Sequence, residues 1–374
     1  RHTRCSRDLE FRRVLFRSYG LSGVLGPYAH RLPGGSGTVR LRDRQDAILL
    51  EVQYGSQFPW PRSADGAGHS LVLARPSFGE GDPRAWAASD RIGGSPGMPD
   101  GVGPDPLRNV VINEFLAHTD ETVEDFIELY NHGNQPVDLS GSFLTDDPAS
   151  MRFIIPPTTL VPARGFVSFS RTQLGFGLSS AGDTIYFVNP SRTRVIDAAE
   201  YGGQAVNLST GRYPDGAPTF RELITPTPGT TNSPWSAHDI VINEIMYHPI
   251  SENDEDEYVE LYNRGTNDLD VSYWRLEGAM DYTFPTNLTI PRGGYLVIAK
   301  SHTNLLAKYV NLNSGNLIGD YQRTLSNRRD RLRLLRPDLE GLLPGNPTLI
   351  TNQPYILVSE VEYEIGRASC RERV

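Results

Sequence analysis

Short apolar runs separated by turn residues make up most of this chain. In residues 126–131 the side chains alternate with a period of two, and residues 166–169 and 295–298 are short β-rich runs that each follow a glycine. A period of two indicates strands, because successive side chains of a strand point to opposite faces. Turn signals recur every eight to twelve residues, as in the Pro-Asp-Gly at 214–216. This spacing predicts an all-β sandwich or barrel, with a short helical turn expected at residues 303–310.

One segment of this pattern occurs twice. Residues 110–115 (VVINEF) and 125–131 (DFIELYN) return as residues 240–245 (IVINEI) and 257–263 (EYVELYN). The two copies are about 130 residues apart, which is the size of a domain. We therefore expect an array of like modules.

Weaker matches extend the repeat beyond its first strands. The pattern at residues 178–190 returns at 325–337 and, in part, at 38–43. Each copy is followed by the same tyrosine, at Tyr54, Tyr201 and Tyr363. The turn Ser95-Pro96-Gly97 likewise corresponds to Thr227-Pro228-Gly229.

These matches divide the interior of the chain into three units. We predict the C-terminal half of a first unit at residues 19–103, a complete unit at 109–232, and a unit at 239–363 that stops short of its end. The linkers between them are short and contain proline, which favours semi-rigid beads on a string.

The two ends of the chain differ from its interior. Residues 1–18 and 364–374 are rich in arginine and resemble in-frame translations of short-read sequencing adapters, so we set them aside from the fold. On this interpretation the chain is an internal fragment of a longer protein. A basic arm for nucleic acid is the alternative interpretation of the first arginines. Both cysteines, Cys5 and Cys370, lie in these ends, so cysteine usage says nothing of the redox compartment.

Setting the ends aside also changes the charge. The 36 basic and 45 acidic side chains of the whole chain fall to 27 and 41, and the net charge moves from −9 to −14. Nucleic acid and anionic lipid bind positive surfaces, so we expect neither as a partner. No run of 18 apolar residues is present, and we expect no membrane span in this chain.

The repeated residues resemble the bacterial lamin tail domain family. The copy at 239–363 shows the family's pattern best, at Asn243-Glu244, residues 257–263, Trp274 and residues 291–298. The Trp-Ala-Ala-Ser at 86–89, followed by the glycine-rich residues 93–97, fits a frequent ending of such modules. The middle copy departs from the pattern, because Phe143 lies near the position of Trp274 and the Trp-Ala-x-Ser ending is missing.

The resemblance covers nearly all of residues 19–363. It implies tandem immunoglobulin-like β-sandwiches in a secreted or cell-surface bacterial protein, and it supplies no catalytic residues. The first function that it implies is a non-catalytic structural spacer, or a binding and adhesion module for protein or glycan ligands. The alternative is a set of accessory modules of a multidomain enzyme, a hydrolase, nuclease or spore-coat-like kinase whose catalytic domain lies outside this chain.

An acidic run at residues 251–257 is the strongest candidate for chemistry. Clustered carboxylates are hard oxygen ligands of the kind that Ca²⁺ accepts. The candidate calcium ligands are Glu252, Asp254, Asp256 and Glu257. The run lacks the spaced Asp-x-Asp-x-Asp-Gly pattern of a dedicated calcium loop, and a solvated acidic loop is the simpler interpretation. We expect no other cofactor.

Catalysis is not favoured. An acid and base pair would have to come from the repeated glutamates, Glu114, Glu128, Glu244 and Glu260. Such pairs work when their environments separate their pKa values, whereas glutamates inside strands are expected to hydrogen-bond the backbone. Residues 93–97 formally satisfy G-x-S-x-G, but Pro96 lacks the N–H that an oxyanion hole needs there. No His-Glu-x-x-His occurs and no interior cysteine completes a zinc site, so we predict no enzymatic activity.

Overall fold

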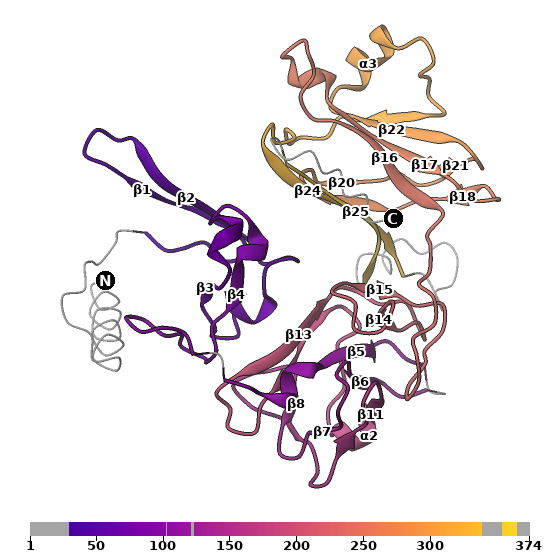
Figure 1. Cartoon of the computed structure of the whole chain (residues 1–374). Coiled ribbons are helices and arrows are strands. Elements are labelled where there is room, and N and C mark those ends of the chain that lie inside the picture. Colours follow the sequence, from indigo (N-terminus) through magenta and orange to yellow (C-terminus); the bar gives the residue numbers. More distant parts are fainter. Residues whose placement is uncertain (1–29, 102, 121–122, 339–353, 365–374) are drawn as a thin grey trace, which may run out of the picture.

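The structure, a computed structural model, describes residues 30–101, 103–120, 123–338 and 354–364. The end segments 1–18 and 365–374, with both cysteines, lie outside the described residues. Figure 1 shows an N-terminal segment beside two stacked β-sandwiches, which we call the middle and C-terminal sandwiches. The predicted all-β fold is confirmed, and the described α-helices are the short α2 (Arg171–Leu174) and α3 (His302–Lys308), the latter where the sequence predicts it. None of the described helices is long and apolar enough to cross a membrane.

The middle sandwich packs a five-stranded sheet against a four-stranded one. The sheets have the orders β11-β6-β5-β14-β15 and β13-β12-β8-β9, and a small ladder joins β7 to β10. The strands are β5 (Val110–Leu116), β6 (Phe126–Asn131), β7 (Val137–Asp138), β8 (Phe143–Thr145), β9 (Phe153–Ile154), β10 (Leu160–Val161), β11 (Phe166–Ser170), β12 (Asp183–Val188), β13 (Val195–Tyr201), β14 (Thr210–Arg212) and β15 (Phe220–Glu222). Ile112, Phe115, Leu129 and Phe187 are fully buried between the two sheets and belong to one core.

The C-terminal sandwich repeats this plan with its own core. Its sheets have the orders β16-β17-β22-β23 and β20-β19-β24-β25, with a ladder between β18 and β21. The strands are β16 (Ile240–Met246), β17 (Tyr258–Asn263), β18 (Leu269–Asp270), β19 (Arg275–Gly278), β20 (Tyr282–Thr283), β21 (Thr289–Ile290), β22 (Tyr295–Ala299), β23 (Leu317–Gly319), β24 (Arg329–Pro337) and β25 (Tyr355–Glu364). Strand β16 corresponds to β5 and β17 to β6. The main difference is that β5 pairs with β14 on its outer side, whereas β16 ends its sheet.

The N-terminal segment consists of two hairpins. Strands β1 (Gly37–Arg42) and β2 (Ile48–Tyr54) form the first, and β3 (Leu71–Leu73) and β4 (Trp86–Ala88) form the second. The register of the first hairpin is that of the hairpins β12–β13 and β24–β25. In each, the repeated tyrosine lies opposite the first strand's opening residues, and a bulge follows four residues later, as in the pairs Gly37–Tyr54, Asp183–Tyr201 and Asp330–Tyr363. The three matched tyrosines therefore occupy one structural position, while the outer bounds of the units stay a prediction.

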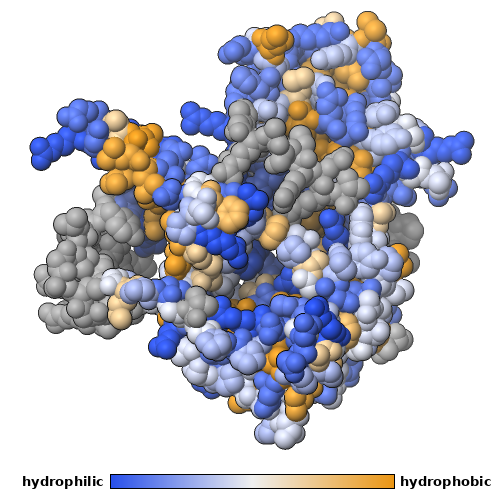
Figure 2. All heavy atoms as spheres, viewed as in Figure 1, coloured by the Kyte–Doolittle hydropathy of each residue, from blue (hydrophilic) through white to orange (hydrophobic). Residues whose placement is uncertain are grey.

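The first hairpin carries exposed apolar side chains where the equivalent strand of the middle sandwich is buried. Five such residues are 39 to 64% exposed, namely Val39, Leu41, Ile48, Leu49 and Leu50. Figure 2 shows them as a hydrophobic patch on the β1–β2 hairpin. Ile185 and Phe187, at the equivalent positions of β12, are fully buried. In the described part of the N-terminal segment these apolar side chains of the β1–β2 hairpin are therefore exposed, whereas those of β12 are buried in a core.

The strand pairings show which residue of the middle sandwich corresponds to Trp274. The strand pairings make Leu144 of β8 equivalent to Leu276 of β19, because each lies opposite the same position of the next hairpin. Trp274 therefore corresponds to Ser142, and Phe143 lies one residue later. Both Trp274 and Ser142 are buried, so the position is internal in both sandwiches although the side chains differ greatly in size.

Candidate functional site

The repeated Ile-Asn-Glu segment forms a β-bulge. The pairing of β5 with β6 shifts between Ile112 and Glu114, so that Asn113 is the extra residue, and the pairing of β16 with β17 shifts at the same place. A bulge sets two residues of one strand opposite one residue of its partner. Asn113 and Glu114 therefore both lie near Glu128 of β6, and the repeat builds a cluster of polar side chains.

In the middle sandwich this cluster is closed by a segment from the end of the unit. The carboxylate of Glu114 accepts hydrogen bonds from the Ser209 hydroxyl at 2.6 Å, the Thr227 N–H at 2.9 Å and the Thr227 hydroxyl at 2.9 Å. Glu114 has no exposed surface. Each oxygen of this buried carboxylate thus has at least one donor, as buried polar groups require.

Glu128 contacts the same closing segment, further along the chain than Glu114 does. Its carboxylate accepts a hydrogen bond from the Gly229 N–H at 2.5 Å and one from the Asn113 side-chain amide at 3.2 Å. The Asn113 amide also donates to Asp215 at 3.0 Å, and its carbonyl oxygen accepts from the Gly216 N–H at 3.0 Å. The expected bonds from the repeated glutamates to the backbone are therefore present in the middle sandwich.

The environment of these carboxylates raises their pKa values. Burial is the main cause for both, and it raises the pKa of Glu128 to about 8 and that of Glu114 above its usual range. The hydrogen bonds from Gly229 and Asn113 act in the opposite direction on the pKa of Glu128 but are the smaller effect. A raised carboxyl pKa suits a general acid. Neither side chain has any exposed surface through which a substrate would reach it, so the arrangement serves the fold.

The same cluster is open in the C-terminal sandwich. The Asn243 amide donates to Glu260 at 2.7 Å, and the Tyr258 hydroxyl donates to Glu244 at 2.7 Å. Asn243 and Glu244 are exposed and Glu260 is half-buried. The sequence repeat is thus preserved, whereas the segment that covers it in the middle sandwich has no described counterpart here.

The asparagine that ends the repeated Glu-Leu-Tyr-Asn has a structural role in both sandwiches. The side-chain amide of Asn131 donates to the carbonyls of Gln135 and Pro162, at 2.8 and 3.0 Å. Asn263 donates to the carbonyls of Asn267 and Ile290, at 2.9 Å each, and Asn131 also lies 3.4 Å from the carbonyl of Val161, the counterpart of Ile290. In both cases the amide oxygen accepts the N–H two residues later. The repeated asparagine therefore fixes the turn that follows the second strand.

The structure assigns Glu257, a candidate calcium ligand, to the interior of the C-terminal sandwich. Glu257 is fully buried and accepts hydrogen bonds from the Leu325 N–H at 3.0 Å and the Tyr321 hydroxyl at 3.3 Å. Asp125 of the middle sandwich accepts the Leu178 N–H in the same way, at 3.0 Å. Glu257 and Asp125, each just before the second strand of its sandwich, thus hold the repeated Leu-Ser at residues 325–326 and 178–179.

The other three candidate ligands do not gather around one point. Asp256 is bonded to Lys308, Asn304 and Ser251. Glu252 and Asp254 are exposed on the loop. In the part of the chain that the structure describes, no three His, Cys, Asp or Glu side chains form a group suited to a metal ion. Calcium binding by this run stays a prediction.

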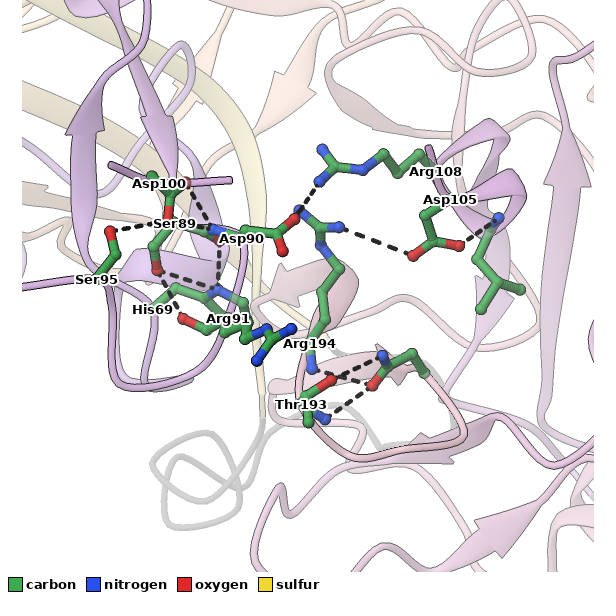
Figure 3. Close-up of polar contacts among 12 residues, drawn as sticks. His69, Ser89, Asp90, Arg91, Ser95, Asp100, Asp105, Arg108, Thr193 and Arg194 are labelled. Carbon is green, nitrogen blue, oxygen red and sulfur yellow. Dashed lines mark hydrogen bonds and ion pairs between the residues drawn. The ribbon is translucent and has the colours of Figure 1, made fainter. Parts of the chain in front are cut away.

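A second polar cluster joins the N-terminal segment to the middle sandwich (Figure 3). Asp90 accepts charged hydrogen bonds from Arg108 at 2.6 Å and Arg194 at 2.8 Å, and Arg194 lies 3.8 Å from Asp105. Arg108 comes just before β5 and Arg194 just before β13, so one aspartate holds two elements of the next unit. Because the side chain of Arg194 is only 11% exposed, this contact is more than a solvated surface pair.

His69 adds an uncharged contact to this junction. Its Nε2 accepts the backbone N–H of Val195 at 2.9 Å, and its Nδ1 lies 2.9 Å from the carbonyl of Ser89. Both bonds form when the imidazole is neutral with its proton on Nδ1. The Ile92 N–H also donates to the carbonyl of Thr193 at 2.8 Å. The junction therefore combines ion pairs with backbone bonds, which limits rotation between the two units.

A cavity of about 410 Å³ lies between the two sandwiches. Charged residues line much of it. Arg331 is paired with Glu360 and Arg333 with Glu277, whereas Arg264 donates to the carbonyl of His238. His238, at its wall, has a pKa lowered to about 4, chiefly by burial.

Sequence reasoning missed the residues that close the cluster in the middle sandwich. They are Ser209, Asp215, Thr227, Gly229 and Asn232. The Thr-Pro-Gly at 227–229 carries a signal, because it has a counterpart in the Ser-Pro-Gly at residues 95–97, but this recurrence by itself predicts only a turn. Its partners lie more than 100 residues earlier in the chain, where no local pattern shows them.

One family of known proteins matches the two sandwiches in sequence. No curated protein matches the chain. A solved structure of a DUF4876 family protein from Bacteroides thetaiotaomicron is similar over 68% of this chain and 77% of that chain, at 12% identity and a TM-score of 0.23. The lamin tail domain model matches residues 104–203 and 233–342. These two matches fall on the two sandwiches and together span more than half of the chain, which therefore belongs to the lamin tail domain family.

Proposed function

We propose that this chain is an array of non-catalytic modules that serves as a structural spacer or binding region in a larger secreted or cell-surface bacterial protein. The proposal rests on the contacts of the repeated carboxylates. Glu114 and Glu128 are fully buried and bonded to the segment that closes their own unit. The residues that define the repeat thus hold a module together, as expected of a scaffold.

The junction between units supports a spacer. Asp90 holds Arg108 and Arg194 of the next unit, and His69 accepts a backbone N–H from the same unit. A spacer has to keep its two ends a set distance apart, which requires that successive modules keep a fixed orientation. Linkers shorter than the modules themselves, with bonded contacts beside them, meet this requirement.

The proposed location rests on the family resemblance, and the proposed class of ligand rests on the charge of the chain. Members of such families occur beside other modules on bacterial surfaces, and the interior net charge of −14 favours neutral or basic partners over nucleic acid. Protein and glycan surfaces meet this condition. The catalytic-accessory alternative has no particular observation in its favour in this chain.

Small-angle X-ray scattering of the whole chain tests the spacer role. We expect the wild-type profile to fit one arrangement of units, and the Asp90→Ala/Arg194→Ala variant to show a larger maximum dimension and a broader distance distribution. Arg42→Ala/Asp46→Ala is the matched control, because it removes an exposed ion pair in the β1–β2 turn, away from the junction. Freely rotating units in the wild-type protein would contradict a spacer.

A further inference from the structure

The outer face of the second sheet carries different side chains in the two sandwiches. In the middle sandwich Phe143, Tyr186 and Ala198 lie on this face and form an apolar cluster with Ala67 of the N-terminal segment. The strand pairings show that the equivalent positions of the C-terminal sandwich are charged, namely Arg275, Arg333 and Glu360. A face that packs against the preceding unit in one sandwich is thus charged in the other.

The preceding unit also reaches this face differently at the two junctions. The connection from the repeated tyrosine to the next strand spans residues 55–70 in the N-terminal segment, where it contains the short helix η1 (Arg62–Ala64) and Ala67. In the middle sandwich the same connection spans residues 202–209. The cavity of about 410 Å³ lies between this shorter connection and the charged face. The space that apolar side chains fill at the first junction is therefore open at the second.

Both walls of the cavity are formed by strands and loops that the structure describes. Figure 1 shows β15 of the middle sandwich beside the β24–β25 hairpin of the C-terminal sandwich, and both elements line the cavity. The two sandwiches meet at Gly203 and Ile356, which form a parallel β-bridge. A Cβ atom at Gly203 would clash with the carbonyl oxygen of Tyr355, so the two backbones are in close contact there. The cavity is therefore a defined space at the junction of two units.

The cavity carries an excess of positive charge in an acidic chain. Acids outnumber bases by 45 to 36 in the whole chain, whereas five arginines and three glutamates line the cavity. Arg264 is exposed at its rim and donates to the carbonyl of His238 at 3.1 Å, and no carboxylate of the described residues pairs with it. After burial, Arg336 and Arg264 are the next causes that lower the pKa of His238, and Asp239 opposes them less strongly. A ligand carboxylate beside Arg264 would therefore meet a positive potential.

An aromatic ring lies beside the same linker. Trp235 is half-buried, lines the cavity and precedes His238 by three residues. The guanidinium of Arg221 lies 4.8 Å from the centre of the Trp235 ring. Because Arg264 is bonded to His238, a flat apolar surface and a cation without an acid partner both border this linker.

This combination matches the chemistry of an acidic sugar. A uronic acid is a sugar ring with one carboxylate, several hydroxyls and an apolar face of C–H groups. Arginine binds a carboxylate through parallel N–H donors, an aromatic ring offers apolar surface to the C–H face, and the Arg331–Glu360 pair offers donors and an acceptor to hydroxyls. The volume of the cavity lies in the range of about 300–1,000 Å³ that ligand pockets have. An inorganic anion would leave the aromatic ring unused.

We propose that this cavity binds an oligosaccharide that contains uronic acid. One carboxylate of the sugar pairs with Arg264, a sugar ring lies against Trp235, and the paired charges of the opposite wall bind hydroxyls. The proposal names a ligand for the binding role in the proposed function and rests on that role. The spacer role is tested separately by scattering, at Asp90 and Arg194, which do not line the cavity.

Isothermal titration calorimetry of the whole chain with trigalacturonate and with triglucuronate tests the site. We expect at least one of the two to bind, at a single site in each chain. Its methyl ester has the same rings without the charges and should bind at least about tenfold more weakly, because a charged hydrogen bond is lost. Inorganic sulfate, an anion without a ring, should not compete at equal concentration. Absence of binding by both sugars, equal binding of the ester, or full competition by sulfate would overturn the proposal.

Two pairs of variants locate the binding. Arg264→Gln should weaken it at least about tenfold, whereas Arg292→Gln makes the same charge change on an exposed arginine outside the cavity and should have no effect. Trp235→Ala should also weaken binding, and Trp235→Phe, which keeps an aromatic ring, should stay within a few-fold of the wild type. The melting temperature of Arg264→Gln should equal that of the wild type, because glutamine keeps a donor for the carbonyl of His238. Wild-type affinity in Arg264→Gln, or equal losses in Arg264→Gln and Arg292→Gln, would contradict a site in this cavity.

Discussion

Glu114 on β5 lies directly opposite Glu128 on β6, and both carboxylates are fully buried. Two facing acids in the interior of a protein favour the protonated form, because burial penalises each charge and each charge penalises the other. Here the donors of one segment, Thr227 and Gly229, offset part of that penalty. The closing segment and the protonation of the pair are therefore coupled.

The first prediction concerns the pH dependence of this coupling. The pKa of Glu128 is raised from 4.5 to about 8, so its contribution to stability is fully present below about pH 4.5 and is lost as the pH rises through 8. Each pH unit in this window costs at most about 1.4 kcal/mol. We expect Glu128→Gln, which imitates the neutral acid, to remove this loss. Hydrogen exchange of peptides covering residues 110–131 should show more protection in the variant than in the wild type above pH 8, and equal protection in mild acid.

Glu260→Gln in the open cluster is the control for this measurement. Glu260 is half-buried and accepts a hydrogen bond from Asn243. Its replacement should therefore leave the change in hydrogen-exchange protection between mild acid and alkaline pH unaltered in residues 240–263. Comparing variants at one pH also cancels the intrinsic pH dependence of exchange. A Glu128→Gln protein whose protection equals that of the wild type at every pH would contradict the loss of stability expected when Glu128 ionises.

The second prediction concerns the repeated asparagines. Asn131→Ala and Asn263→Ala each leave two carbonyls and one N–H of a turn without their side-chain partner. We expect each to lower the free energy of unfolding of its own sandwich by about 1–3 kcal/mol. Urea titration followed by hydrogen exchange of each sandwich separates the two effects. Asn267→Ala is the control, since Asn267 contributes its carbonyl to the turn, and a loss as large as that of Asn263→Ala would refute the assigned role.

The fold was predictable because its signals are local. The period of two in residues 126–131, the glycine before each short strand and the recurring tyrosines are all visible within a few residues, and they correspond to β6, β11 and the hairpins. The sequence places Phe143 only near the position of Trp274, because the loop before it gives no local marker of register, and the strand pairing identifies Ser142 as the equivalent residue. Local patterns thus identify the strands, whereas the residue-by-residue alignment of the copies becomes known only from the strand pairing in the structure.

The polar cluster was less predictable, because its members come from distant parts of the chain. Glu114 and Thr227 are 113 residues apart, and Asp256 meets Lys308 52 residues later. Nothing near Asp256 in the sequence distinguishes an acid that binds a lysine from one that binds a cation. The burial of Glu114 likewise depends on a closing segment whose counterpart at Glu244 is not described, so two identical motifs have different exposure.

The third prediction concerns calcium. The hypothesis of a site at residues 252–257 predicts a higher melting temperature on adding millimolar calcium. Asp256 is paired with Lys308, and the buried Glu257 accepts the Leu325 N–H. Only Glu252 and Asp254 of the four candidate ligands are therefore exposed, whereas calcium takes six to eight oxygen ligands. We therefore expect calcium and magnesium to shift the melting temperature equally. A larger shift with calcium that disappears in Asp254→Asn would establish the site instead.

The last prediction concerns the junction at His69. Burial is the main cause that lowers the pKa of His69 below its usual 6.5, and the nearby Arg194 acts in the same direction. A lowered histidine pKa contributes stability that is present above 6.5 and is lost as the pH falls below it. The reason is that a proton on Nε2 replaces the acceptor of the Val195 N–H with a second donor. We expect hydrogen exchange at residues 189–195 to accelerate, beyond its intrinsic change, between about pH 7.5 and pH 5.5. His69→Phe should exchange fast at both pH values, whereas His248→Gln, on an exposed histidine, should behave like the wild type. Protection of residues 189–195 that stays constant down to pH 5.5 would mean that the ion pairs of Asp90 hold the two units together without His69.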